Sequence, residues 1–238
     1  MGKLRIFVDR MSQPSRAVII FCLTNGIDAE ERFVNLAKGE HRKPEFKSIN
    51  PMSLVPAMDD NGFHLFESHA MLRYLACAKP NIKDHWYPVD VKKRAQIDCI
   101  LDWHHNSLRS GSVGLVFNSV LAPVMGRPLD LDAAAEAESL LRASLKGMEA
   151  LWLSDKEGFL TGSLQPSIAD LSLACEMMQL QLLDKSKVSD LLDTSPNVKS
   201  WLHTVERTLS PHFSQVHETL LKAANMYQKR REREARKD

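Results

Sequence analysis

The feature that most constrains this chain is a change of hydrophobic periodicity close to residue 80. Before that point, short apolar and β-branched runs alternate with helical patterns. After about residue 89, strand patterns vanish and the 3.6-residue period of amphipathic helices dominates. Such a pattern is typical of an α/β unit followed by an all-α unit. We therefore predict a first domain at residues 1–80, a linker at 81–88 and an all-helical domain at 89–227.

Strand patterns in the first half predict a small mixed sheet. They fall at residues 4–9, 32–35, 55–58 and 63–66. A helix that begins near Pro14 and closes at Asn25-Gly26 separates the first two strands, so these two can run parallel. The hairpin signal at residues 60–62 (DNG) makes the last two strands antiparallel.

Helix patterns fill most of the remaining chain. Residues 38–47 are expected to hold a short helix or loop, and 69–78 a helix with Ser68 as its N-cap. Ser167 and Asp170 have the spacing of a capping box. The basic residues 228–238 are expected to form a frayed tail, although such tails also serve as nuclear addresses or anion-binding patches. The second half has helix patterns at residues 92–106, 133–152, 167–183, 198–209 and 213–227.

Composition excludes several classes of function. A net charge of +1 argues against a nucleic-acid partner, which would require a strongly basic face. No apolar run of about 18 residues predicts a membrane span, and no secretory signal pattern is present. The cysteines lack metal-binding spacing, and Cys22 and Cys77 fit buried helical positions. We therefore expect a cytoplasmic protein without a metal ion or a membrane anchor.

Ser12 is the strongest candidate for chemistry in the first half. It lies between the first strand and the first helix, where unpaired N–H groups and the helix dipole favour negative charge. A thiolate placed there is stabilised, but the chain has no cysteine at this point, so the thiol must come from a ligand. A hydroxyl of Ser12 or Ser15 can then donate a hydrogen bond to sulfur. The alternative is that Ser12 only caps the helix.

Two further segments are candidates for holding a peptide-like ligand. If the Val55-Pro56 bond is cis, Val55 can turn its backbone N–H and C=O toward a peptide. Glu67 and Ser68 precede a helix, so that they can bind the amino and carboxylate groups of an amino acid. The alternative for this pair is an ordinary N-cap with an acidic neighbour.

Together these pieces resemble the glutathione transferases, and most closely their theta class. The resemblance covers nearly the whole chain, from Leu4 to about His217, and implies a thioredoxin-like first domain followed by an all-α second domain. Six motifs in family order carry it: MSQPSR at residues 11–16, INP…VPA at 49–57, FESHA at 66–70, DHWYP at 84–88, LDWH at 101–104 and PSIADL at 166–171.

The resemblance also implies roles for individual residues. Ser12 is similar to the family's catalytic serine, which hydrogen-bonds the glutathione thiolate. Leu54 stands where the family usually has a lysine for a glutathione carboxylate, so we expect weakened glutathione binding unless Arg42 or Lys43 takes over. Other residues implied to bind glutathione are His41, Val55, Glu67, Ser68 and Arg109. Candidate walls of the second-substrate pocket, which fit core positions equally well, are Trp103, Leu115, Val116 and Met177.

The expected activity is attack by bound glutathione on a small hydrophobic electrophile. By resemblance, the electrophile is an organic hydroperoxide, an alkyl or arylalkyl halide or an isothiocyanate, and the protein is a homodimer. Two alternatives stay open. One is a ligand-binding protein of the same fold without useful catalysis, which the Leu54 departure keeps open. The other is an interaction module whose basic tail binds an anionic partner.

Overall fold

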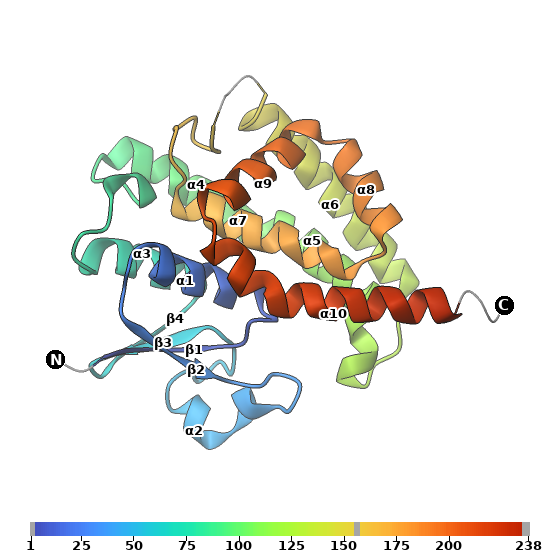
Figure 1. The fold of residues 1–238 in the computed structure, drawn as a ribbon, viewed down its shortest axis with the longest axis horizontal. Helices are drawn as coiled ribbons and strands as arrows, with labels where there is room; N and C mark the ends of the chain where they lie inside the picture. Colours follow the sequence, from blue (N-terminus) through green and yellow to red (C-terminus); the bar gives the residue numbers. More distant parts are fainter. Residues whose placement is uncertain (1–2, 155–157, 235–238) are drawn as a thin grey trace.

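The first half of the computed structural model is a four-stranded sheet with helices on both faces (Figure 1). The structure describes residues 3–154 and 158–234. The strands are β1 (Leu4–Val8), β2 (Ala29–Phe33), β3 (Ala57–Asp60) and β4 (Phe63–Phe66), in the spatial order β2-β1-β3-β4. β1 pairs parallel with β2 and antiparallel with β3, and β3 pairs antiparallel with β4. The expected mixed sheet is confirmed, although β2 begins three residues before its predicted start.

Local sequence explains the turns and helix ends of this half. Helix α1 (Gln13–Thr24) has Pro14 in its first turn and ends before Gly26, whose φ of 63° suits glycine. Asn61 and Gly62 also have positive φ, as the hairpin between β3 and β4 requires. The 3₁₀ turn η1 (Glu40–Arg42) and the short helix α2 (Pro44–Lys47) fill the charged connection.

Helix α3 (Ser68–Ala78) begins one residue earlier than predicted, and its N-cap is Glu67 rather than Ser68. Glu67 holds φ at 67° and its carbonyl accepts from the N–H of Met71. The linker region contains the turn η2 (Asp84–Trp86). Helices α1 and α3 lie between the sheet and the second half, while α2 covers the opposite face of the sheet (Figure 1).

The second half is entirely helical. Its helices are α4 (Val91–Asn106), α5 (Leu108–Val116), α6 (Leu131–Leu151), α7 (Ile168–Met178), α8 (Lys185–Asp193), α9 (Pro196–Thr208) and α10 (His212–Glu234). Between them lie the turns η3 (Phe117–Leu121), η4 (Ala122–Met125) and η5 (Gln179–Leu182). The predicted helix at 167–183 is thus α7 followed by η5. One buried hydrophobic cluster runs from β1 and α1 through α7 to α10, so the two halves share a core.

Three features of this half differ from the prediction. Helices α5 and α8 were not anticipated, and α10 continues through Glu234 where a frayed tail from residue 228 was expected. Residues 235–238 of that tail lie outside the described part. In α5, a Cβ on Gly111 would come within 2.5 Å of the Leu141 backbone, so this glycine permits close packing against α6. Because glycine has a low helix propensity, Gly111 made α5 hard to predict from the sequence.

The Ser167–Asp170 capping box is confirmed, and it does more than cap the N-terminus of α7. The Asp170 carboxylate accepts from the Ser167 N–H at 2.8 Å, while Ser167 Oγ accepts from the N–H groups of Ala169 and Asp170. The buried Asp170 carboxylate also accepts from the Leu160 N–H and from Trp201 Nε1 at 2.9 Å. This one side chain therefore ties α7 to the preceding loop and to α9.

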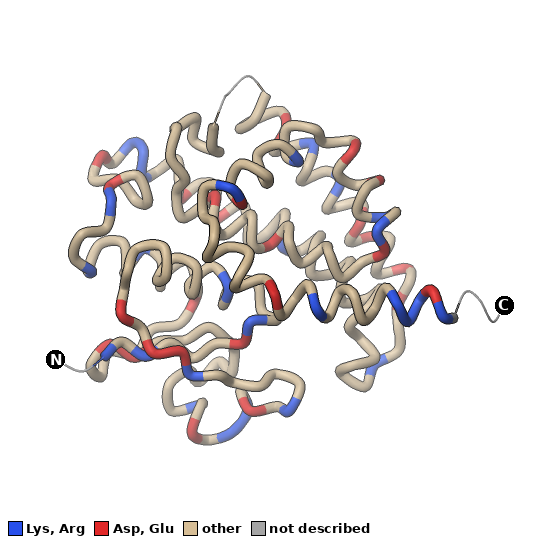
Figure 2. The backbone as a smooth tube through the Cα atoms, in the orientation of Figure 1, with Lys and Arg blue, Asp and Glu red and all other residues tan. Residues whose placement is uncertain are grey.

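Surface charge is mixed, and basic residues gather toward the distal end of α10 (Figure 2). Within the described residues, one helical run, Val91–Met125, is long and apolar enough by length and composition to cross a membrane, with a mean hydropathy of 1.2. Core helices of water-soluble proteins pass the same test. This run consists of α4, α5, η3 and η4, and α5 packs closely against α6. Of the cysteines, Cys22 is buried as expected, whereas Cys77 is exposed.

Candidate functional site

Two cavities adjoin in the cleft between the α/β half and the helical half. The first has a volume of about 230 Å³ and is lined mainly by polar residues of both halves. The second has a volume of about 510 Å³ and mainly apolar walls. Four residues line both cavities, so the two form one continuous site: Gln13, Leu54, Val55 and Arg109.

Ser12 lies at the N-terminus of α1 and lines the larger cavity beside Gln13. Its backbone is extended and occupies the N-cap position, but its hydroxyl makes no capping hydrogen bond. Ser15 is different, because it is fully buried and its Oγ accepts from the Asp9 N–H at 3.5 Å. Of the two serines, only Ser12 therefore presents a hydroxyl to the cleft.

A fully buried arginine supports the loop that carries Ser12. Arg16 Nη1 donates to the carbonyls of Arg10 and Met11 at 2.9 and 3.1 Å. Its Nη2 donates to the Cys175 carbonyl at 3.1 Å and to Gln179 Oε1 at 2.8 Å. Burial lowers the pKa of Arg16 to about 10, which leaves the guanidinium charged at neutral pH. This cation fixes the Ser12 loop against the helical half.

The polar cavity has the groups needed to hold an amino-acid zwitterion at one end. Glu67 and Ser68 both line it, as do Val55 and Pro56. The Val55-Pro56 peptide bond is cis, which was the condition for Val55 to turn its backbone toward a peptide ligand. Glu67 is an exposed non-glycine residue with positive φ, a conformation that clusters at functional sites. Its carboxylate and the N-terminal N–H groups of α3 offer one negative and one positive patch.

Leu54 and His41, which the resemblance implies as glutathione-binding positions, both line the larger cavity. Leu54 lines both cavities and is 59% exposed, so its side chain stands at the rim. His41 lines the larger cavity, and burial, followed by the nearby Arg42, lowers its pKa. Arg42 and Lys43 are not among the residues that line either cavity.

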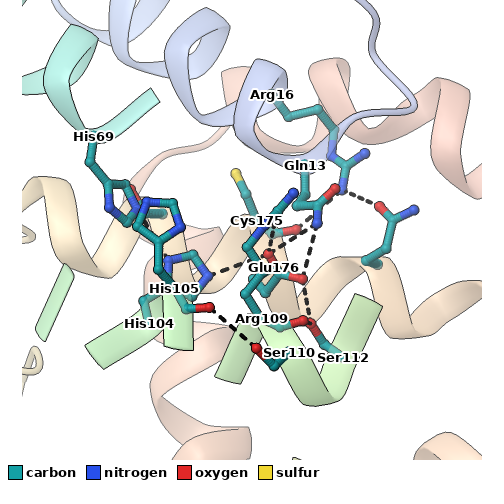
Figure 3. A network of polar contacts seen from close by, with 12 residues as sticks. Gln13, Arg16, His69, His104, His105, Arg109, Ser110, Ser112, Cys175 and Glu176 are labelled. Atoms are coloured by element: carbon teal, nitrogen blue, oxygen red, sulfur yellow. Dashed lines mark hydrogen bonds and ion pairs between the residues drawn. The ribbon is translucent and has the colours of Figure 1, made fainter. Parts of the chain in front are cut away.

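The buried carboxylate of Glu176 connects three helices at the junction of the cavities (Figure 3). It accepts from Gln13 Nε2 at 3.0 and 3.1 Å, from Arg109 Nη1 at 2.9 Å and from His104 Nε2 at 3.3 Å. The Ser112 hydroxyl also donates to it. Burial alone would raise the Glu176 pKa, but the donors and the charge of Arg109 lower it to about 2. Arg109 is thus held at the cleft by a paired anion.

A row of histidines extends from Glu176 along the polar cavity (Figure 3). Because a carboxylate only accepts, His104 Nε2 carries a proton, and its Nδ1 lies 3.2 Å from His69 Nε2. The His69 and His105 rings are 4.3 Å apart. Burial and then the His104 ring lower the His69 pKa to about 2, so this imidazole is neutral at physiological pH.

Apolar side chains from α5, η3, η4 and α10 form the wall of the larger cavity. Of the predicted walls, Val116 lines it, whereas Leu115 and Met177 are core residues away from it. Trp103 does not line it either, because its indole packs edge-on against Trp152 at 4.7 Å. The apolar wall residues contributed by the helical half are Val113, Val116, Phe117, Leu121, Val124, Met125 and Tyr227.

Several site residues were missed by the sequence analysis. Glu176 carried a signal, because it is the one charged residue in the mainly apolar part of α7 that follows Asp170. Gln13 stands next to Ser12 in the same motif. The histidines and Tyr227 carried none, since polar residues in a helix pattern ordinarily face solvent. In the described ranges 3–154 and 158–234, no group of three or more His, Cys, Asp or Glu side chains is arranged to hold a metal ion.

Comparison with known proteins agrees with this architecture. A family model for the "Glutathione S-transferase, N-terminal domain" matches residues 4–77. The chain is 54% identical over 232 residues to "Glutathione S-transferase T1" of Arabidopsis thaliana, covering 98% of this chain and 95% of that protein. It is 51% identical to "Glutathione S-transferase T2" of the same plant, covering 97% of this chain and 39% of that protein.

Solved structures agree as well. Human glutathione transferase theta-2, crystallised with glutathione and an unknown ligand, superposes with a TM-score of 0.85 at 35% identity, covering 95% of this chain and 91% of that one. A human theta-class enzyme in complex with the glutathione conjugate of 1-menaphthyl sulfate superposes with a TM-score of 0.86 at 35% identity, covering 96% of this chain and 91% of that one. Fold and site define a glutathione transferase. The chain belongs to the theta class of that family.

Proposed function

We propose that the polar cavity binds glutathione and that Ser12 stabilises its thiolate for attack on an electrophile in the apolar cavity. The observation that carries the proposal is the Ser12 hydroxyl, which lines the cleft at the start of α1 and is not used as a helix cap. A hydroxyl donor and the positive end of a helix both favour the sulfur anion. The human theta-2 structure with glutathione supports the choice of ligand.

Each part of glutathione has a matching group. Glu67 binds the ammonium of the γ-glutamyl unit, and Ser68 with the α3 N-terminus binds the carboxylate of the same unit. The Val55 backbone pairs with the cysteinyl unit. His41, which lines the adjoining larger cavity, is proposed to hold the glycine carboxylate where glutathione extends into that cavity. Leu54 replaces a cation there, so we expect glutathione affinity below that of relatives with lysine. Arg109, paired with Glu176 at the junction, faces both substrates.

We further propose that organic hydroperoxides are substrates. The glutathione thiolate attacks the terminal peroxide oxygen, the O–O bond breaks, and the leaving alkoxide takes a proton from solvent to become an alcohol. The glutathione sulfenic acid then reacts with a second glutathione to give the disulfide and water. Ser12 and the α1 N-terminus keep the attacking sulfur ionised, while the apolar cavity holds the alkyl group. The protein is proposed to act as a cytoplasmic homodimer.

The test is glutathione-dependent reduction of cumene hydroperoxide by the wild-type chain, Ser12→Ala and Ser110→Ala. Ser110 is an exposed serine of α5 outside both cavities, so it controls for loss of a hydroxyl. We expect at least a tenfold fall in kcat/KM for Ser12→Ala only. If all three proteins bind glutathione but none reduces the peroxide, the proposed peroxidase activity is wrong. The chain then fits the alternative of a non-catalytic ligand-binding protein, which the Leu54 departure keeps open.

A further inference from the structure

The distal half of α10 is less buried than its start. Phe213, Val216 and Leu220 are buried, and they fix the start of this helix against the rest of the molecule. After Leu220 no residue of α10 up to residue 233 is fully buried, and Met226 is 72% exposed. Helix α10 packs along η5. Ala223, Ala224 and Tyr227 still pack half-buried against the core, so polar contacts add to a limited apolar packing in this part of the helix.

Arg231 makes several of the polar contacts of this part of the helix, beside a hydrogen bond between the Gln228 and Asp184 side chains. Its Nη2 donates to the Leu183 carbonyl at 3.0 Å, and both terminal nitrogens lie within 3.4 Å of the Leu182 carbonyl. Its Nε is 3.8 Å from Asp184 Oδ2. Leu182 is the last residue of η5, and carbonyls at the end of a helical turn lack partners and carry partial negative charge. A guanidinium is well suited to such a group of acceptors.

The same contact positions a wall of the apolar cavity. Tyr227 lines that cavity and precedes Arg231 by four residues, so both side chains lie on one face of α10. Gln179, at the start of η5, lines the cavity from the opposite element. By binding the end of η5, Arg231 joins the two elements that bear these residues. Arg231 itself does not line the cavity.

We propose that Arg231 is a positioning residue for the second substrate, which holds Tyr227 of α10 over the apolar cavity. The inference rests on the proposed function, because it assigns that cavity to the electrophile. Without Arg231 the distal helix samples open positions, and a ligand must bind the closed fraction only. Its apparent affinity then falls in proportion to that fraction. Glutathione itself is expected to be little affected, because none of the groups proposed to bind it is on α10.

The test compares the dissociation constants of glutathione and S-hexylglutathione, measured by titration calorimetry. S-hexylglutathione places an apolar chain in the second cavity. Arg231→Ala is compared with Lys229→Ala, which removes an equal charge from an exposed position of the same helix. Alanine has high helix propensity, so neither change should unwind α10. We expect Arg231→Ala to weaken S-hexylglutathione about three- to tenfold, with glutathione and the Lys229 variant within about twofold of wild type.

A double-mutant cycle with Tyr227→Ala separates positioning from general damage. If Arg231 acts through Tyr227, its removal has little further effect on S-hexylglutathione once the ring is gone. Equal losses for both ligands, or additive losses in the cycle, would overturn the inference. Failure of the wild-type chain to bind either ligand would remove the proposed function and the inference with it. If the wild type binds both ligands and the ratio of their dissociation constants is the same in Arg231→Ala, only the inference is overturned.

Discussion

Replacing Glu176 with glutamine should destabilise the protein strongly, although the two side chains have nearly the same shape. The carboxylate oxygens accept from Gln13, His104, Arg109 and Ser112, all at a fully buried position. A glutamine keeps one acceptor but turns an NH₂ donor toward groups that are donors themselves. Arg109 also loses its anion.

The size of the effect follows from the carboxylate's pKa. Its value is about 2 against an ordinary 4.5, and this difference is equivalent to about 3 kcal/mol of stability at 1.36 kcal/mol per pKa unit. Breaking a buried ion pair costs a similar ~3–5 kcal/mol. For a chain of this length, about 3 kcal/mol lowers Tm by roughly 6–12 °C.

The dependence on pH has a definite sign. The folded state holds this proton less tightly than the unfolded state, so the stabilisation is complete above pH 4.5 and is lost as pH falls toward 2. Protonated Glu176 resembles glutamine. The difference between wild type and Glu176→Gln should therefore shrink by about 1.4 kcal/mol for each pH unit below 4.5.

The assay is urea unfolding of wild type, Glu176→Gln and Glu138→Gln at pH 7 and near pH 3.5. Glu138 is a useful control because it also pairs with two cations, Arg142 and Lys187, but near the surface. Its substitution should cost less than about 1 kcal/mol. A Glu176→Gln effect no larger than the control at pH 7, or one that does not change with pH, would refute the reasoning.

Three further predictions concern affinity, stability and assembly. Leu54→Lys should tighten glutathione binding about three- to tenfold in a calorimetric titration, because it adds a cation at the rim of the polar cavity, and Leu54→Met should not. Asp170→Ala should lower the free energy of unfolding by about 3–5 kcal/mol, since it strands the N–H groups of Ser167, Leu160 and Trp201, and a loss below about 1 kcal/mol would contradict this account. Light scattering should give a mass near twice the 26.9 kDa of one chain, whereas a monomer mass would rule out the proposed homodimer.

Local signals predicted the elements that carry the first half of the site. Pro14 fixed the start of α1, so Ser12 was placed at its N-terminus, and the Asp-Asn-Gly turn fixed the hairpin. Each of these signals acts within a few residues. Their physical causes, such as a fixed φ or a missing N–H, belong to the residue itself.

The second half of the site depended on contacts that sequence spacing does not encode. Glu176 bonds Gln13 across 163 residues, and no local pattern links the two. Trp103 was a candidate for the pocket wall or for the core, and it packs half-buried against Trp152 instead of lining the cavity. The distal turns of α10 look like a charged tail in the sequence, and only the carbonyls at the end of η5 make Arg231 an anchor.

The central claim is that Ser12 stabilises a glutathione thiolate, and the most direct measurement is a pH titration of thiolate absorbance in the glutathione complex. The account predicts that the bound thiol of the wild type titrates below the ordinary value of about 8.5. In Ser12→Ala this pKa should rise by about 1–2 units, as expected for loss of a hydrogen bond to a charged group. Identical pKa values in both proteins, with glutathione bound in each, would contradict the claim.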